Sequence, residues 1–168
     1  MSDDTKDPAK LQERLWKELD NVKFGMLGIV GGEPHHMQPM SVFEDRANNA
    51  VWFYSNKDTD LARDAGNGGA QAMLCIMTKD DEFQACLHGE LSLSHDRAKI
   101  DQYWSPFVAA WFPDGKDDPG LTMIRMDLMD ARVWASKRGP FNYPFQVAKA
   151  NATHTLPDVG GKADLQLG

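Results

Sequence analysis

The feature that most constrains the fold of this chain is a pair of alternating segments joined by a short turn. AQAMLCIM (70–77) and FQACLHGELSLS (83–94) alternate apolar with other side chains, and Asp80 and Asp81 lie between them. A two-residue turn at these aspartates would pair the segments as an antiparallel hairpin. The alternation then gathers six apolar side chains on one face, namely Leu74, Ile76, Ala85, Leu87, Leu91 and Leu93. We therefore expect an antiparallel sheet with one buried face.

Further strands are expected around this hairpin, because short apolar or aromatic segments alternate with turn residues. They are predicted at FGMLGIV (24–30), MQPMSVFED (37–45) and AVWFYS (50–55), with one or two more at 121–136. Pro39 cannot donate a ladder hydrogen bond, so its strand should lie at an edge or a bulge.

Helices are predicted only as short elements at the joins. Leucines at helical spacing after Pro8 indicate an amphipathic first helix. Asp58 or Thr59 can cap a second helix that ends at Ala65, and His95-Asp96 can start a third. A loop and a short helix are expected at 140–152. The predicted fold is mainly β with short helices (α+β) and barrel-like, with one domain over 1–150 and a polar tail over 151–168.

The composition limits the partners. The 168 residues carry a formal net charge of -7, which argues against nucleic acid or an anionic membrane as the main partner. No apolar run reaches the length of a membrane helix, and the N-terminal residues MSDDTKDPAK have no signal-peptide core, so a cytoplasmic protein is expected. Cys75 and Cys86 fit this setting as unpaired thiols, although the hairpin register would also allow a disulfide between them.

Motifs for catalysis or metal binding are missing. The chain has no G-x-G-x-x-G, Walker or G-x-S-x-G sequence. His35-His36, His88 and His95 lack the spacing of metal ligands, and no pair of carboxylates argues for acid–base chemistry. We therefore predict no catalytic side chain and no metal site.

One stretch, FYSNKDTDL (53–61), raises the question of phosphate binding, because an aromatic strand runs into a helix start there. The hydroxyls of Ser55 and Thr59 and the N–H groups of the helix start have the shape of a phosphate site. Lys57 and Arg63 are the nearby cations. The alternative is an ordinary capped helix without a ligand.

A second unusual stretch, WFPDGKDDPGL (111–121), follows Trp104 closely. It is too polar for a core and too rich in aromatic residues, proline and glycine for an arbitrary loop. Such a loop can cover a planar ligand or a partner subunit, and a purely structural role is equally compatible with it.

From the first helix to Trp134 the chain resembles the pyridoxamine-phosphate-oxidase-like split β-barrels, in particular their general stress protein branch. The most specific match is WFPDGKDDPGLTMIRM (111–126), which is similar to that branch's W-F-x-x-G-x-D-D-P-x-L stretch before a strand. The resemblance implies an antiparallel split β-barrel that forms a homodimer and binds flavin mononucleotide (FMN) in clefts at the subunit interface.

The resemblance also implies individual cofactor contacts. YSN (54–56) matches the Y-T-N that closes a strand in the oxidases, and QPM (38–40) falls where the stress-protein branch has R-P-M. Gln84 matches a flavin-contacting glutamine, and Trp134 resembles the tryptophan of the oxidases' E-F-W strand. The cofactor-binding residues predicted in this way are Gln38, Met40, Ser41, Tyr54, Ser55, Lys57, Thr59, Gln84, Trp111 and Trp134.

Departures from the family pattern point to weaker phosphate binding. Asp60-Leu61 replace the Arg-Lys pair that clamps the flavin phosphate in the oxidases, and Gln38 replaces an arginine. After Trp134 there is no R-L-H-x-R motif, which argues against oxidation of vitamin B6. We expect FMN to bind more weakly here than in the oxidases.

Two classes of function follow. The first is a flavin-dependent oxidoreductase of unknown substrate, with a nicotinamide as an electron donor. The second is a non-catalytic module that binds or senses flavin or another small ligand. Haem or a deazaflavin in the same cleft ranks behind both.

Overall fold

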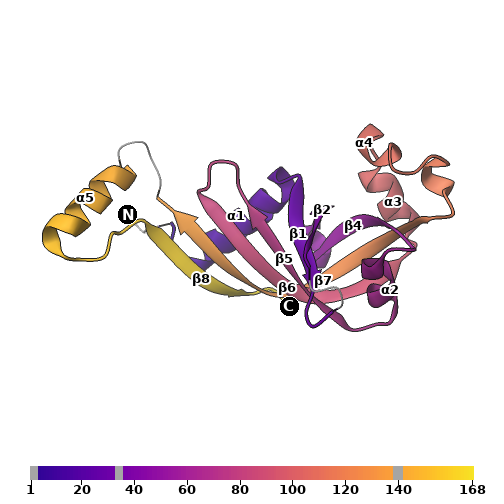
Figure 1. The fold of residues 1–168 in the computed structure, drawn as a ribbon, viewed down its shortest axis with the longest axis horizontal. Coiled ribbons are helices and arrows are strands. Elements are labelled where there is room, and N and C mark those ends of the chain that lie inside the picture. The colour runs from indigo at the N-terminus through magenta and orange to yellow at the C-terminus, as the bar shows by residue number, and fades with distance from the viewer. Residues whose placement is uncertain (1–3, 33–35, 138–141) are drawn as a thin grey trace.

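The sheet dominates the structure, a computed structural model that describes residues 4–32, 36–137 and 142–168 (Figure 1). Its antiparallel strands are β1 (Phe24–Ile29), β2 (Gln38–Ser41), β3 (Phe43–Asp45), β4 (Ala50–Asn56), β5 (Ala70–Met77), β6 (Phe83–Ser94), β7 (Leu121–Ser136) and β8 (Gly160–Gln166). Their order is β2-β1-β5-β6-β7-β4-β3, and β8 pairs with β7 beside this path. The helices are α1 (Pro8–Asn21), α2 (Asp60–Gly66), α3 (Arg97–Tyr103), α4 (Pro106–Ala109) and α5 (Asn142–Thr153).

The sheet curls because its two end strands are neighbours in the chain. β2 and β3 lie at opposite ends of the strand order, yet only Val42 separates them. The described pairings join β2 to β1 and β3 to β4, and none joins β2 to β3. The fold is therefore an antiparallel split barrel, as expected, and its last gap is crossed by the chain itself rather than by hydrogen bonds.

The segment 37–45 is two strands and not the single strand that we predicted. The division falls at Val42, whose side chain is only 7% exposed and joins the core. A strand that must change from one end of the sheet to the other has to break its ladder. The prediction for Pro39 is confirmed, because β2 is an edge strand whose described partner is β1 alone.

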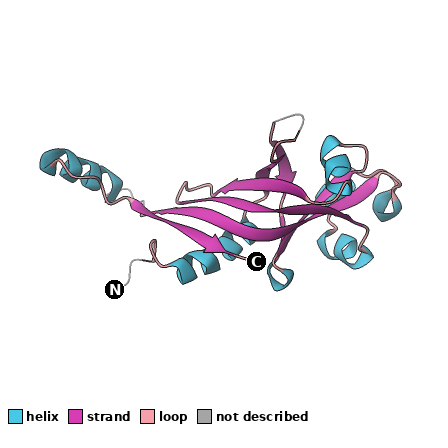
Figure 2. Cartoon of the chain, turned by 90° about the horizontal axis from the view of Figure 1, so that it is seen from below, coloured by secondary structure: helices cyan, strands magenta, loops and turns pink. Residues whose placement is uncertain are grey.

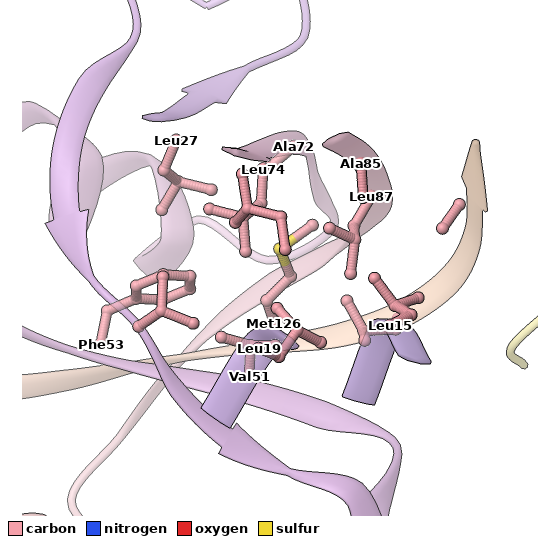
Figure 3. Packing of buried hydrophobic residues seen from close by; sticks show 14 of the residues in the cluster. Leu15, Leu19, Leu27, Val51, Phe53, Ala72, Leu74, Ala85, Leu87 and Met126 are labelled. Atoms are coloured by element: carbon pink, nitrogen blue, oxygen red, sulfur yellow. The ribbon is translucent and has the colours of Figure 1, made fainter. Parts of the chain in front are cut away.

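The central hairpin has the predicted register, with Cys75 opposite Cys86. Its inner face, the leucines of α1 and strands β1 and β4 form the main core (Figure 3). Leu74, Ile76, Ala85, Leu87 and Leu91 are buried as expected. Leu93 is the exception and is 37% exposed, because β6 extends past the core to the C-terminal end of α2, where Leu93 lies against Gly66.

The long strand β7 covers the whole of 121–136 and carries two neighbours on one side. Its first half pairs with β4 and its second half with β8. A bulge between His88 and Gly89 of β6 shifts the register between these halves, and a side chain at Gly89 would meet the carbonyl oxygen of Asp127 at 2.3 Å. Bulges of this kind bend a strand and help the sheet to curl.

The C-terminal residues correct our prediction of a polar tail, because residues 160–166 form β8. The alternation that defines a strand is present but weak: Leu165 is buried against the core, while Lys162 and Asp164 face solvent. Asp164 forms an ion pair with Arg132 of β7 at 2.6 Å. Two glycines and two charged residues conceal this strand from a hydropathy argument.

The helices occupy distinct places around the sheet. α1 lies along one face, α3 and α4 gather at one end, and α5 projects beyond the other end (Figures 1 and 2). No helix in the described ranges combines the length and the apolar character needed to cross a membrane.

Candidate functional site

A cleft of about 420 Å³ opens between β2, the end of β4 and α4. We call it the aromatic cleft. It is lined by Phe24, Gln38, Pro39, Met40, Ser41, Phe43, Tyr54, Ser55, Asn56, Thr59, Phe107, Val108, Trp111 and Phe112. Its volume lies within the range of small-molecule and cofactor sites.

The cleft changes character along its length. Ser41 of β2 lies opposite Phe24, which contacts the Phe107 ring at a centroid distance of 6.0 Å. Three residues along β2, Gln38 lies near Thr59 of the turn between β4 and α2, because these two residues also line an adjoining hollow together. The cleft is therefore aromatic at the Ser41 end of β2 and polar at the Gln38 end.

The floor of the aromatic end is held rigidly by a second hydrophobic cluster. Tyr54 packs edge-on against Phe43 and Trp104, with centroid distances of 5.4 and 6.0 Å. Its hydroxyl donates a hydrogen bond to the carbonyl oxygen of Ile100 at 2.6 Å. Burial, with a smaller contribution from the charge of Asp101, raises the pKa of Tyr54 well above its ordinary value, so the phenol stays neutral.

The rim of the aromatic end consists of exposed rings. Trp111 is 73% exposed and Phe107 is 54% exposed, although both line the cleft. Large exposed aromatic side chains beside a concave surface are typical of a site that is covered by a ligand or a partner. The neighbouring Phe112 is buried and anchors this rim to the second cluster.

The polar end is formed by the turn between β4 and α2, which the sequence had suggested as a phosphate site. Thr59 caps α2, because its hydroxyl accepts a hydrogen bond from the Ala62 N–H and donates to the Asn56 carbonyl oxygen at 2.9 Å. The Ser55 hydroxyl lies 3.0 Å from the Thr59 hydroxyl and 3.3 Å from the same carbonyl oxygen. Both hydroxyl groups are therefore engaged within the turn.

The backbone and the cations of this turn are engaged in the same way. The Asp58 N–H donates to the Asn56 side chain, and the Lys57 N–H donates to the Gly120 carbonyl oxygen. The Arg63 guanidinium is paired with the Asp60 carboxylate and with the Asp58 carbonyl oxygen. The Lys57 ammonium alone among these groups makes no hydrogen bond or ion pair to a described residue.

A second hollow, of about 400 Å³, adjoins the polar end of the cleft and shares Gln38 and Thr59 with it. We call it the acidic hollow, because three carboxylates line it. Its lining residues are Leu27, Gly28, Ile29, His36, Met37, Gln38, Asp58, Thr59, Asp60, Leu61 and Asp64.

A third polar group, the Asp45 cluster, lies behind the aromatic end. Asp45 is 7% exposed, and its carboxylate accepts from Lys99 at 2.6 Å, from the Trp52 indole at 3.0 Å and from the Asn48 amide. Burial by itself would raise the pKa of Asp45, but these hydrogen bonds and the Lys99 charge hold it below its ordinary value. The cluster fastens α3 to β3 and β4.

Tyr103 of α3 reinforces this contact by donating a hydrogen bond to the Glu44 carbonyl oxygen at 2.8 Å, and burial raises the pKa of Tyr103 to about 12.

The structure brings seven of the ten predicted cofactor residues to the aromatic cleft: Gln38, Met40, Ser41, Tyr54, Ser55, Thr59 and Trp111. Lys57 lies beside the cleft in the exposed turn. Gln84 and Trp134 line a different surface, where they are direct cross-strand neighbours on the outer face of the sheet.

The lining residues missed by sequence reasoning include three aromatic residues of the aromatic end, Phe24, Phe107 and Phe112. Phe24 is the first residue of β1, in which exposed and buried residues alternate. Gly25 and Leu27 are buried, so Phe24 faces outward. Phe107 and Phe112 lie within or next to the aromatic loop that the sequence did single out, but no sequence pattern tells which of these rings face a ligand.

The cleft contains no charged side chain among its described lining residues. The described ranges also contain no group of three or more potential metal-ligating side chains. His35, one of the histidines considered as a ligand, lies outside the described residues. The arrangement can hold and orient a planar, largely neutral molecule, and it supplies no acid, base or nucleophile of its own.

The class of protein is defined by comparison with known families. The family model described as "Pyridoxamine 5'-phosphate oxidase like" matches residues 10–158, so the chain belongs to this family. The resemblance inferred from 111–126 and from the strand motifs is confirmed at this level.

Individual relatives narrow the comparison to general stress proteins. The chain is 25% identical over 125 residues to general stress protein 26 of Bacillus subtilis (strain 168), covering 73% of this chain and 87% of the relative. A crystal structure described as a general stress protein 26 from Jannaschia sp. CCS1 matches with a TM-score of 0.80 and 32% identity, over 94% of this chain and 99% of the other. The general stress FMN/FAD binding protein of Xanthomonas citri matches with a TM-score of 0.71 and 33% identity, over 78% and 92% of the two chains.

Proposed function

We propose that the aromatic cleft binds a flavin, FMN being the form expected from the sequence. The observation that carries this proposal is the convergence of three separate segments, QPM (38–40), YSN (54–56) and the rim at 107–112, on one cleft with aromatic walls. The Xanthomonas citri relative, whose name describes FMN/FAD binding, supports the same ligand class.

The residues present fit a flavin ring system. The rings of Tyr54, Phe107 and Trp111 offer apolar surface to a planar molecule. The Ser41 hydroxyl can exchange hydrogen bonds with the edge of the ring, and the Gln38 amide, at the other end of the same wall, can do so with the ribityl chain. The bond from Asp58 N–H to the Asn56 side-chain oxygen leaves the Asn56 amide N–H groups for the ligand.

We further propose that the active form is a homodimer. Gln84 and Trp134, which the family resemblance assigns to the cofactor, do not reach the cleft of their own chain. They lie on the outer face of the sheet. Cross-strand pairs join Trp134 to Gln84 and Gln84 to Met77, and this row of side chains leads to Phe24 at the edge of the cleft. Met77 is 62% exposed and Trp134 is 40% exposed.

A second copy packed on this outer face would cover these exposed apolar side chains. It would also bring the partner's indole and amide to the open side of the aromatic cleft. Exposed aromatic and methionine side chains of this kind are enriched in protein interfaces.

The flavin would supply hydride or single-electron transfer, and the protein would supply binding, orientation and a dry surface. Tyr54 is the one ionisable side chain among the described lining residues, and it is a neutral phenol bonded to Ile100. We therefore propose a flavin-dependent oxidoreductase with NAD(P)H as donor, and no oxidation of pyridoxamine phosphate. The alternative, a module that binds flavin without turnover, is favoured by this same lack of an acid or base. The cytoplasmic location stays a prediction from the sequence.

The test of flavin binding is a visible absorption spectrum of the purified protein incubated with FMN and then freed of unbound flavin. We expect oxidised-flavin bands to remain with the protein. In the Trp111→Ala variant the affinity should fall roughly ten- to fiftyfold, since a ring wall of the cleft is removed. Phe145→Ala removes an exposed ring on α5, away from the cleft, and serves as the matched control.

The outcomes separate the alternatives. Wild-type protein that retains no flavin would contradict the proposed function altogether. Retained flavin together with NAD(P)H oxidation supports the oxidoreductase, whereas retained flavin without turnover across donors supports the binding module. Sedimentation of wild type and Trp134→Glu tests the dimer, which the introduced charge should dissociate.

A further inference from the structure

The structure assigns the aromatic cleft a preference for the ring of the flavin and none for a terminal phosphate, so a flavin without phosphate, such as riboflavin, should bind at least as tightly as FMN. This inference rests on the proposed flavin function. It concerns the polar end of the cleft, the turn between β4 and α2, and the acidic hollow.

The direction in which a bound flavin lies follows from the two ends of the cleft. The aromatic end, with Phe24 opposite Ser41, offers the surface that a planar ring system needs. The polar end, with Gln38 and Thr59, is where a hydrated ribityl chain can leave the rings. A phosphate on that chain would then arrive at the turn before α2 and at the mouth of the acidic hollow.

Several of the donors that a phosphate could use at this point are already committed, the exceptions among the described groups being the Lys57 ammonium, the Asn56 amide and the first two N–H groups of α2. The hydroxyls of Ser55 and Thr59 and the N–H groups of Lys57 and Asp58 all bond within the protein. The Arg63 guanidinium is held by Asp60. A phosphate would have to break these bonds or accept water in their place, so it gains little from these hydroxyls, these two N–H groups and Arg63.

The charges at the turn are unfavourable as well. Asp58, Asp60 and Asp64 line the hollow that the phosphate would face, while Lys57 is the one cation of the turn without an ion pair to a described residue. Exposed charges interact weakly and are screened by salt. Each carboxylate therefore repels a phosphate weakly. Together these repulsions oppose the attraction between the phosphate and the single mobile ammonium of Lys57.

The test is a pair of calorimetric titrations of the same protein with FMN and with riboflavin, at about 20 mM and about 300 mM salt, which bracket strong and weak screening. We expect riboflavin to bind as tightly as FMN or up to about fivefold more tightly at low salt, with the difference shrinking at high salt.

The variant that sharpens this test is the triple substitution Asp58→Asn, Asp60→Asn and Asp64→Asn. It removes the repulsion and releases Arg63, so FMN should become the tighter ligand by several-fold, while the riboflavin affinity stays constant. Glu82→Gln removes one carboxylate from the turn between β5 and β6 and should leave the ratio unchanged. The single variant Asp60→Asn, expected to shift the ratio in the same direction by a smaller factor, replaces the triple variant if the latter does not fold.

FMN bound more than tenfold more tightly than riboflavin by the wild-type protein would overturn the inference. A ratio that does not move in the aspartate variants would overturn it too. If neither flavin binds, the proposed function itself has failed, which is a different result.

Discussion

The Asp45 cluster and the acidic hollow both place carboxylates next to basic side chains, but they do so in opposite ways. Asp45 is buried, and each of its neighbours Lys99, Trp52 and Asn48 donates to it. In the hollow, Asp58 and Asp60 are exposed, and of the two only Asp60 forms an ion pair between described residues. A buried, fully bonded carboxylate stabilises the fold, whereas exposed carboxylates beside a cleft act mainly on what may enter it.

The largest expected difference between the two regions is in stability. Asp45→Ala leaves the Lys99 ammonium and the Trp52 indole without their acceptor in a buried site, and should lower the free energy of unfolding by about 2–4 kcal/mol. Asp60→Ala removes an exposed ion pair and should lower it by less than about 1 kcal/mol. Urea unfolding of the two variants measures both effects, and equal losses would contradict the comparison.

A smaller effect should appear in the pH dependence of stability. The pKa of Asp45 is lower in the folded than in the unfolded protein, so the unfolded state binds its proton first as the pH falls. Its contribution is complete above the unfolded pKa of about 4 and is lost as the pH drops through the folded pKa. Asp45→Asn should therefore flatten the decline of the thermal midpoint between about pH 5 and pH 2. A wild-type slope in the variant would show that Asp45 does not carry this dependence.

The smallest effect is expected from Lys57. Because this exposed ammonium is the single uncommitted cation of the turn, Lys57→Ala should weaken FMN binding by roughly two- to fivefold. Riboflavin has no phosphate for the ammonium to attract, so its affinity should not change. A loss of more than about twentyfold for FMN would instead indicate a true phosphate site at this turn.

Much of the fold follows from periodicity in the sequence. The leucines of α1, the register of the Cys75–Cys86 hairpin and the edge position of Pro39 are all local or nearest-neighbour features, and each is confirmed. Cys75 and Cys86 are indeed adjacent, with a distance of 3.3 Å between their sulfur atoms, and both are free thiols.

Features that depend on the whole sheet were not accessible from local patterns. The break at Val42 follows from closure of the barrel, and β8 forms because the second half of β7 needs a partner once β4 has ended. Neither requirement leaves a strong mark on the sequence, because 37–45 reads as one segment and 160–166 contains two glycines and two charged residues.

The site shows the same contrast between features that local sequence predicts and features that depend on the whole fold. Residues that are close in sequence to a recognisable motif, such as Tyr54 and Trp111, reach the cleft. The state of each polar group there could not be predicted, because the hydroxyls of Ser55 and Thr59 share one carbonyl oxygen only in the folded turn. The placement of Gln84 and Trp134 depends on a second copy of the chain and stays a prediction.

The most direct test of the central claim is an NMR titration of the ¹⁵N-labelled protein with FMN, followed through the backbone amide shifts. We expect the largest changes in 38–43, 54–59 and 107–112, which contain the lining residues of the aromatic cleft, with Gln84 and Trp134 joining them if the dimer forms. Binding of FMN with these three segments unmoved, and changes elsewhere in the sheet, would contradict the assignment of the cleft as the flavin site.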